Sequence, residues 1–177
     1  MKQIKLGIVI GSVRKNRATI RPAKALVDLS KNFPIEVKEL DLLDFNLPIY
    51  DESHPKQEQP WIDAIKTPDA LILVFPEYNF RPCPAILNAL DYLRKYEIKN
   101  KIIGLVSVSN GNIGGIRAQA VMRSSLPTFG VYLLPTSVAV PNVEKTFPIN
   151  GAYDENIKEK LKQLISELID LTNKLKK

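Results

Sequence analysis

Short apolar runs alternate along this chain with stretches whose apolar residues recur at helical spacing. Residues 70–75 (ALILVF) are continuously apolar, as in a strand that is buried on both faces. The same signals predict strands at 4–10, 35–40, 70–75, 101–108 and 131–140, and helices at 19–31, 84–96, 116–129 and 157–175. This repeated alternation indicates an α/β protein with a parallel sheet and helices on both faces.

Individual residues and the absence of linkers add detail to this predicted architecture. Pro135 lies inside the last strand and predicts a bulge or an edge position there, because proline cannot donate to a sheet ladder. Asp154 precedes the last helix and is a plausible N-cap. No internal repeat and no Gly/Ser linker interrupts the 177 residues, so we expect a single domain over 1–177.

The net charge of +6 is concentrated near the N-terminus. Residues 1–38 hold nine basic and two acidic side chains, a local net charge of +7, so the remaining residues sum to −1. A nucleic-acid binder more often spreads basic residues over a face built from several elements. We therefore expect a small anionic ligand and no nucleic-acid partner.

Cysteine and histidine usage excludes further classes of protein. Cys83 and His54 are each the only residue of their type, so neither a disulfide framework nor a cysteine or two-histidine metal site is expected. No apolar run approaches the roughly 18 residues of a membrane span. We expect a cytoplasmic protein that binds neither a metal nor a membrane.

The loop after the first strand carries anion-binding groups at the start of a helix. Ser12 and Thr19 offer hydroxyl donors, and Arg14 and Arg17 offer charged donors. The start of a helix adds unpaired N–H groups and partial positive charge, so this set suits a phosphate monoester. The alternative is a solvated basic loop with an ordinary N-cap.

Two more loops are expected at the same edge, because ligands of such sheets bind beyond the carboxyl ends of the strands. Tyr78 and Asn79 follow the third strand in a proline-rich loop that suits a rigid wall for a planar ligand. Residues 107–115 follow the fourth strand and contain glycines that allow close backbone approach. Alone, each could be an ordinary turn.

Other polar residues suggest less specific roles. Cys83 is either a redox thiol or, between two prolines, a packing residue. Asp41, Asp44, Asp51 and Glu52 follow the second strand, and we expect them to be solvated. His54 lies in a polar stretch and is expected to be solvated as well.

Four motifs together resemble the NADPH-dependent FMN reductase family, which includes quinone, azo-dye and chromate reductases. They are GSVRKNR (11–17), LPIYDE (47–52), PEYNF with NALDYL (76–80 and 88–93) and SNGNIGGIRAQAVMR (109–123), and the resemblance runs from about residue 4 to 141. It implies a flavodoxin-like three-layer sandwich whose five-stranded parallel sheet has the order 2-1-3-4-5. It also implies non-covalent FMN, NAD(P)H as co-substrate, a small-molecule acceptor and a homodimer or homotetramer.

The resemblance also implies a set of cofactor-binding residues. Ser12, Arg14 and Arg17 would hold the FMN phosphate, with Thr19 and Ile20 near the helix start and Gly11 and Val13 in the same loop. Pro76, Glu77, Tyr78 and Asn79 would run along the ribityl chain and the isoalloxazine, and Ser109, Asn110 and Gly111 would cover its pyrimidine end. Leu87 and Pro82-Cys83-Pro84 depart from the family pattern near the flavin rim and the usual subunit contact.

The implied reaction is hydride transfer from NAD(P)H to FMN followed by ping-pong reduction of a quinone, azo, flavin or similar acceptor. Hydride transfer requires no protein acid or base, and we name no catalytic residue. Two alternatives stay open at this point. One is an FMN-binding electron carrier or redox sensor without efficient turnover, and the other is a domain for a different phosphorylated small molecule.

Overall fold

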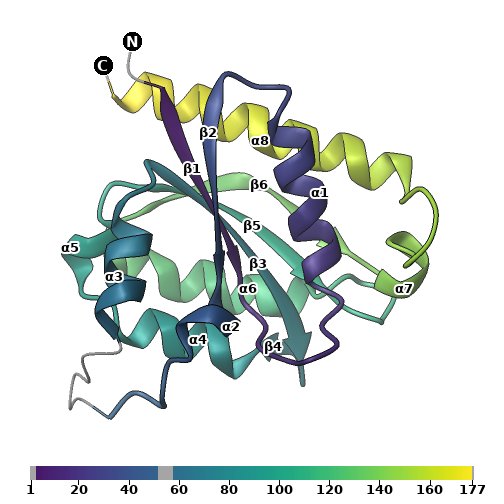
Figure 1. Ribbon diagram of the computed structural model, residues 1–177, viewed down its shortest axis with the longest axis horizontal. Coiled ribbons are helices and arrows are strands. Elements are labelled where there is room, and N and C mark those ends of the chain that lie inside the picture. The colour runs from purple at the N-terminus through teal and green to yellow at the C-terminus, as the bar shows by residue number, and fades with distance from the viewer. Residues whose placement is uncertain (1–2, 52–57, 177) are drawn as a thin grey trace.

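Five parallel strands form the centre of the molecule, which is shown as a computed structural model with residues 3–51 and 58–176 described (Figure 1). The strands are β1 (Ile4–Ile10), β2 (Ile35–Asp41), β3 (Ala70–Tyr78), β5 (Ile102–Val108) and β6 (Tyr132–Val140). Their order across the sheet is β2-β1-β3-β5-β6, and all four neighbouring pairs are parallel. Counted among the parallel strands alone, this is the expected order 2-1-3-4-5.

A sixth, two-residue strand was not expected. β4 (Arg81–Pro82) folds back on the end of β3 as an antiparallel hairpin, pairing Tyr78 with Arg81. The two loop residues, Asn79 and Phe80, both have positive φ, 49° and 64°. This is the backbone of a type I′ turn, whose twist matches that of the flanking strands.

Helices cover both faces of the sheet. Figure 1 shows α1 and α8 on one face and α3, α4 and α6 on the other, and the two apolar clusters divide in the same way. The bounds are α1 (Ile20–Ser30), α2 (Leu42–Phe45), α3 (Gln59–Lys66), α4 (Pro84–Asp91), α5 (Lys95–Ile98), α6 (Ile116–Ser125), α7 (Val143–Thr146) and α8 (Glu155–Leu175), with a 3-10 turn at Leu126–Phe129. This is the expected three-layer α/β architecture.

Strand β1 shows why the central runs are apolar throughout. Leu6, Ile8 and Ile10 belong to the cluster under α1 and α8, whereas Val9 belongs to the cluster on the opposite face. Successive side chains of a strand point to opposite faces, so a strand covered on both sides requires an apolar residue at nearly every position.

Element boundaries differ from the expectations in two helices. The helix expected at 84–96 ends at Asp91, and α5 begins separately at Lys95. The helix expected at 116–129 ends at Ser125 and continues as the 3-10 turn. Pro127 falls inside that turn and cannot donate an i→i−4 bond, which explains the tighter geometry.

Two detailed predictions are confirmed. The register of β5 and β6 shifts between Ile103 and Leu105, opposite a longer stretch of β6 that contains Pro135, and β6 is an edge strand of the parallel sheet. The Asp154 carboxylate accepts a hydrogen bond from the Ile157 amide at 2.9 Å and caps α8.

Candidate functional site

A cavity of about 300 Å³ opens at the carboxyl edge of the parallel sheet. The end of β3 and the segments that follow β1, β5 and β6 all contribute to it. Its lining comprises Ser12, Arg14, Asn16, Arg17, Ala18, Thr19, Pro76, Glu77, Tyr78, Val108, Ser109, Asn110, Val143 and Glu144. The fold therefore brings together nine of the residues singled out from the sequence, and they come from all three of the expected loops.

The loop after the fifth parallel strand also contributes, through Val143 and Glu144. Backbone hydrogen bonds join the segment after β6 to the loop after β5. Val143 N donates to Ser109 O and Asn142 N donates to Gly111 O, each at 3.1 Å. The rule that pointed to the ends of the other strands applies here as well. Applied to β6, it would have found these residues.

Gly11 lies beside the cavity and has a packing role. Its amide donates to Val74 O at 2.8 Å, and a Cβ at this position would lie 3.1 Å from Ile86 Cβ. Its carbonyl accepts a hydrogen bond from the Cys83 thiol at 2.9 Å. Glycine at this position lets α4 approach the end of β1.

Four other predicted residues stand outside the cavity lining. Val13 lines a second, apolar cavity of about 260 Å³ beside α2 and α4. Ile20 packs against the core under α1, Asn79 forms the exposed tip of the hairpin, and Gly111 lies exposed in the loop beyond Asn110.

Two polar atoms beside the cavity are buried without a hydrogen-bond partner: Arg17 Nε and Thr19 Oγ1. Thr19 occupies the N-cap position of α1 and is 2% exposed, yet its hydroxyl makes no capping bond, because its backbone is already helical. Buried polar atoms are nearly always paired, so unpaired donors that border a cavity point to a missing polar ligand. The first turn of α1 contains no acidic residue, which leaves the helix start favourable to an anion.

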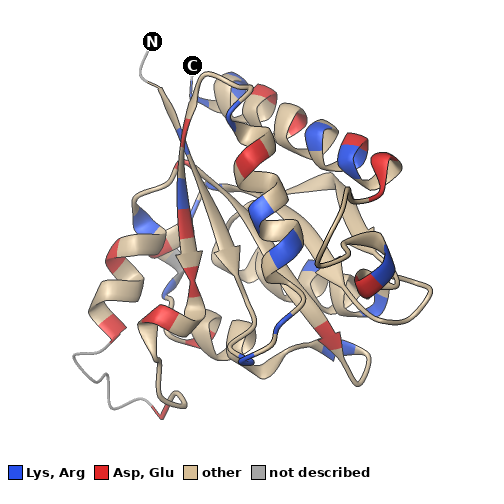
Figure 2. Ribbon diagram, turned by 45° about the vertical axis from the view of Figure 1, so that its right-hand side comes forward, with Lys and Arg blue, Asp and Glu red and all other residues tan. Residues whose placement is uncertain are grey.

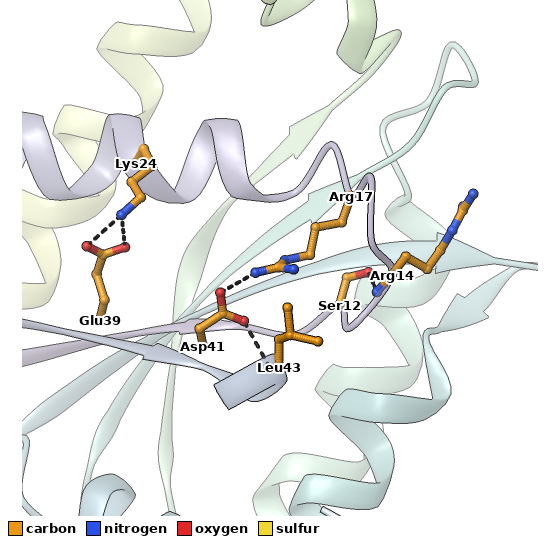
Figure 3. A network of polar contacts seen from close by, with 7 residues as sticks. All are labelled: Ser12, Arg14, Arg17, Lys24, Glu39, Asp41 and Leu43. Atoms are coloured by element: carbon orange, nitrogen blue, oxygen red, sulfur yellow. Dashed lines mark hydrogen bonds and ion pairs between the residues drawn. The ribbon is translucent and has the colours of Figure 1, made fainter. Parts of the chain in front are cut away.

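The Arg17 guanidinium forms an ion pair with Asp41, the last residue of β2 (Figure 3). The expectation that Asp41 is solvated was wrong. Its side chain is 15% exposed, and its other oxygen accepts a hydrogen bond from Leu43 N at 3.0 Å, capping α2. The sequence separation of Arg17 and Asp41 gave no signal of this pairing.

Tyr78, the last residue of β3, contacts the loop after β1. Its hydroxyl lies 3.3 Å from Ser12 Oγ, and the Arg14 guanidinium lies 5.7 Å from the centre of its ring. Ser12 is almost fully buried, whereas Arg14 is exposed at the rim. Together they form a wall that combines aromatic surface with hydroxyl and cationic groups.

Glu77 connects the end of β3 to α6. Its carboxylate accepts a hydrogen bond from Ala118 N at 3.0 Å, near the start of a helix whose own N-cap, Gly115, has no side chain to do so. Further inside, Gln119 donates to Ser107 Oγ at 2.8 Å and to Val138 O at 2.9 Å. This buried polar network fixes the loop that carries Ser109.

Local charge is more balanced than the sequence suggested. Five of the eight basic residues that the structure describes in 3–38 form ion pairs, in the pairs Lys5–Glu36, Arg17–Asp41, Arg21–Glu144, Lys24–Glu39 and Lys31–Asp28. Basic and acidic residues alternate along β2 and α8 (Figure 2). Of the described residues that line the cavity, Arg14 and Arg17 are the basic ones, and Glu77 and Glu144 are the acidic ones.

The departures from the family pattern have structural roles. Cys83 precedes α4 and Pro84 begins it, a position where the missing amide of proline costs no helical bond. Cys83 is 2% exposed, and burial raises the pKa of its thiol, which favours a packing role over a reactive one. Leu87 packs partly buried against the cluster around α4.

Among residues 3–51 and 58–176, no group of three or more histidine, cysteine or acidic side chains could hold a metal ion. No helix in the described part of the chain is long and apolar enough to cross a membrane. Asp44 and Asp51 are exposed, as expected. His54 and Glu52 lie outside the described residues.

The fold defines a flavodoxin-like α/β protein with a cavity at the carboxyl edge of its sheet. Residues 4–145 match the model of the NADPH-dependent FMN reductase family, and the chain belongs to that family. This membership confirms the resemblance seen in the motifs, the enzyme class, and FMN with NAD(P)H as cofactor and co-substrate.

Individual relatives agree with this assignment. An NADPH azoreductase of Bacillus sp. (strain OY1-2) is 28% identical over 169 residues, covering 93% of this chain and 90% of that protein. A quinone reductase of Pseudomonas putida is 36% identical over 128 residues, covering 68% of each. FerB, a flavoenzyme NAD(P)H:(acceptor) oxidoreductase from Paracoccus denitrificans, has the same fold, with a TM-score of 0.81, 24% identity and coverage of 97% and 98%.

Proposed function

We propose that this enzyme binds FMN with the phosphate in the cavity at the start of α1, and uses it to pass reducing equivalents from NAD(P)H to a small aromatic acceptor. The observation that carries the proposal is the pair of buried, unpartnered atoms Arg17 Nε and Thr19 Oγ1, which belong to two residues of the cavity lining. A phosphate monoester has three anionic oxygens and can accept several charge-assisted hydrogen bonds.

Four side chains are proposed to hold the phosphate: Ser12, Arg14, Arg17 and Thr19. The hydroxyls of Ser12 and Thr19 are buried, and a buried donor gains more from pairing with an anion than an exposed one. Arg14 is exposed and can close over the rim. Ile20 begins α1, and its backbone belongs to the helix start that favours an anion.

The remaining lining is proposed to hold the rest of the cofactor. Pro76, Glu77 and Tyr78 line the cavity from the end of β3, and Ser109 and Asn110 line it from the loop after β5. When bound, FMN supplies the chemistry by taking a hydride from NAD(P)H and giving electrons to a second acceptor, which makes ping-pong kinetics the expected pattern. The chain's own contribution is binding, orientation and access.

Quinones, azo compounds and flavins are the proposed acceptor classes, because related enzymes carry the names NADPH azoreductase and quinone reductase. An electron carrier without turnover is the alternative from another class. The enzyme reading is favoured because the relatives reported above are named as reductases and because the chain belongs to a reductase family.

A binding experiment tests the cofactor proposal. FMN and riboflavin differ only in the phosphate, so titration of the apoprotein by flavin fluorescence isolates its contribution. We expect FMN to bind at least about a hundredfold more tightly than riboflavin, since several charge-assisted bonds are lost together. Equal affinity for the two flavins would contradict the assignment of the phosphate, and failure to bind either would favour another phosphorylated ligand.

Steady-state kinetics test the reaction. NADH and NADPH are each varied against 1,4-benzoquinone and against an azo dye, with the FMN-loaded protein. Parallel double-reciprocal lines are expected for a ping-pong order, and intersecting lines would contradict it. Flavin that is bound yet reduced by neither nucleotide at a useful rate would favour the carrier.

The oligomeric state, the cellular location and the number of domains stay predictions. A homodimer or homotetramer is proposed from the family resemblance, and light scattering after size exclusion tests it. A cytoplasmic location is proposed because the one cysteine forms no disulfide framework, and fractionation of cells tests it. The single domain over residues 1–177 predicts one cooperative unfolding transition.

A further inference from the structure

The ion pair between Arg17 and Asp41 is unusually well shielded for a pair beside an open cavity. The two side chains are 8% and 15% exposed. The Arg17 guanidinium uses Nη2 for Asp41, while its Nε is buried without a partner. Arg17 is among the residues that line the cavity and Asp41 is not, so Arg17 is the member of the pair that belongs to the cavity lining.

The Asp41 carboxylate is itself held at both oxygens. One accepts from the Arg17 guanidinium, and the other accepts from Leu43 N at 3.0 Å, at the start of α2 (Figure 3). Asp41 is the last residue of β2, and it pairs with Ile10 at the end of β1. The carboxylate is therefore fixed by the sheet and by a helix start, which makes it a rigid anchor.

A neighbouring pair shows what such a contact looks like without these constraints. Lys24 of α1 pairs with Glu39 of β2, two residues before Asp41 on the same strand, with 2.8 Å between Nζ and Oε2. Their side chains are 57% and 33% exposed, and neither lines the cavity. Exposed pairs of this kind contribute little, because water and salt screen them.

We propose that Asp41 is a positioning residue for the cofactor phosphate, acting only through Arg17. It holds the guanidinium in one orientation, so that Arg17 meets the phosphate with its rotamer already fixed and its unpaired Nε available. Preorganisation of a flexible cationic side chain lowers the entropic cost of binding an anion. This inference rests on the proposed function, since it takes FMN as the occupant.

Asp41→Asn is the sharpest variant. Asparagine is as good an N-cap as aspartate, so the bond from Leu43 N is retained while the charge that anchors Arg17 is removed. Glu39→Gln is the matched control, because it removes the same charge from the same strand two residues away. Flavin fluorescence and circular dichroism give affinity and folding for each variant, and Asp41→Ser, which also caps, replaces Asp41→Asn if that variant does not fold.

Three results are expected. Asp41→Asn weakens FMN binding about tenfold and leaves riboflavin binding unchanged, because riboflavin has no phosphate. Glu39→Gln changes FMN affinity by less than about twofold. In an Arg17→Ala background, Asp41→Asn has no further effect, because residues that act through one another are not additive.

Each contrary outcome is informative. FMN binding by Asp41→Asn that is as tight as in the unaltered protein, or tighter, overturns the inference, since the carboxylate would then only repel the phosphate. An equal loss in the Arg17→Ala background overturns it as well, because Asp41 would then act independently. If the unaltered protein itself binds FMN no better than riboflavin, the proposed function fails first, and the two failures are thereby distinguished.

Discussion

The carboxylate of Glu77 lies 3.0 Å from the backbone nitrogen of Ala118, so a residue near the end of β3 caps the helix that follows β5. Such a carboxylate supplies both a hydrogen-bond acceptor and a negative charge to a helix start. The contact ties a residue of the cavity lining to the start of α6, and it gives a motif residue a structural role in addition to the proposed binding role.

The first prediction concerns this cap. Glu77→Ala is expected to lower the free energy of unfolding by about 1–2 kcal/mol, and Glu77→Gln by less, because glutamine keeps an oxygen that can accept from Ala118 N. Urea denaturation of the apoproteins measures both. If both variants unfold with the same free energy as the unaltered protein, the contact contributes nothing to stability.

The second prediction concerns the unpaired hydroxyl of Thr19. Thr19→Val keeps the shape and removes the buried oxygen, so the apoprotein is expected to gain about 1 kcal/mol of stability while FMN binding weakens severalfold. Thr172→Val is the control, because the Thr172 hydroxyl is buried but donates to Leu168 O at 2.7 Å. Thr172→Val should therefore lower the free energy of unfolding and leave FMN affinity unchanged. Thr19→Val should instead raise the free energy of unfolding and weaken FMN binding, as urea denaturation and FMN titration will show.

The third prediction concerns Arg14 at the rim. Losing one charge-assisted contact to a phosphate should cost about 1.5–3 kcal/mol, so Arg14→Ala is expected to weaken FMN binding about tenfold to a hundredfold. Lys15→Ala serves as the control, because Lys15 is adjacent and exposed but does not line the cavity. An unchanged FMN titration for Arg14→Ala would remove Arg14 from the site.

The fourth prediction concerns the hairpin tip. Phe80 has a φ of 64° and is 65% exposed, with Arg117 lying 4.4 Å above its ring. Glycine tolerates this backbone and alanine does not, so Phe80→Gly is expected to be about 1 kcal/mol more stable than Phe80→Ala. The comparison cancels the lost ring contact, which both variants share.

A control for the hairpin prediction lies at Ile149, which is 84% exposed and has no positive φ. There the usual order should hold, with the alanine variant more stable than the glycine variant, because glycine gains more freedom on unfolding. Thermal denaturation of the four variants checks the reversal. The same order at both positions would refute it.

The fifth prediction concerns pH. Burial by itself would raise the pKa of Asp69, but the bonds from Lys176 Nζ and Lys5 N outweigh it and lower the pKa below its ordinary value of 3.8. The folded state therefore favours the ionised carboxylate. Its stabilisation is complete above pH 3.8 and is lost as the pH falls through the lower value in the folded state.

Asp69→Asn should accordingly flatten the decline of stability below about pH 4. Asp44→Asn, which changes an exposed carboxylate, should leave that decline as it is in the unaltered protein. Urea midpoints measured between about pH 3 and pH 6 decide between them. A variant at Asp69 with the same acid dependence as the unaltered protein would show that this carboxylate is not the cause.

Much of the fold could be predicted because the spacing of apolar residues along the chain indicates which positions of a strand or helix are buried. The run at 70–75 is apolar at every position, and β3 is buried on both faces as that run required. Helix ends were harder. The division of 84–96 into α4 and α5 depends on contacts around Tyr92 and Arg94 that no local period records, including the bond from the Arg94 amide to Glu97.

The sequence by itself determined the α/β architecture, the three loops at one edge of the sheet and the family, because local periodicity and contiguous motifs carry that information. Only the tertiary structure decided which charges meet. Arg17 and Asp41 are 24 residues apart and Glu77 and Ala118 are 41 apart, and their pairing follows from strand order and register. The same packing left Thr19 Oγ1 and Arg17 Nε buried without partners, since burial and pairing of a side chain are properties of the assembled fold.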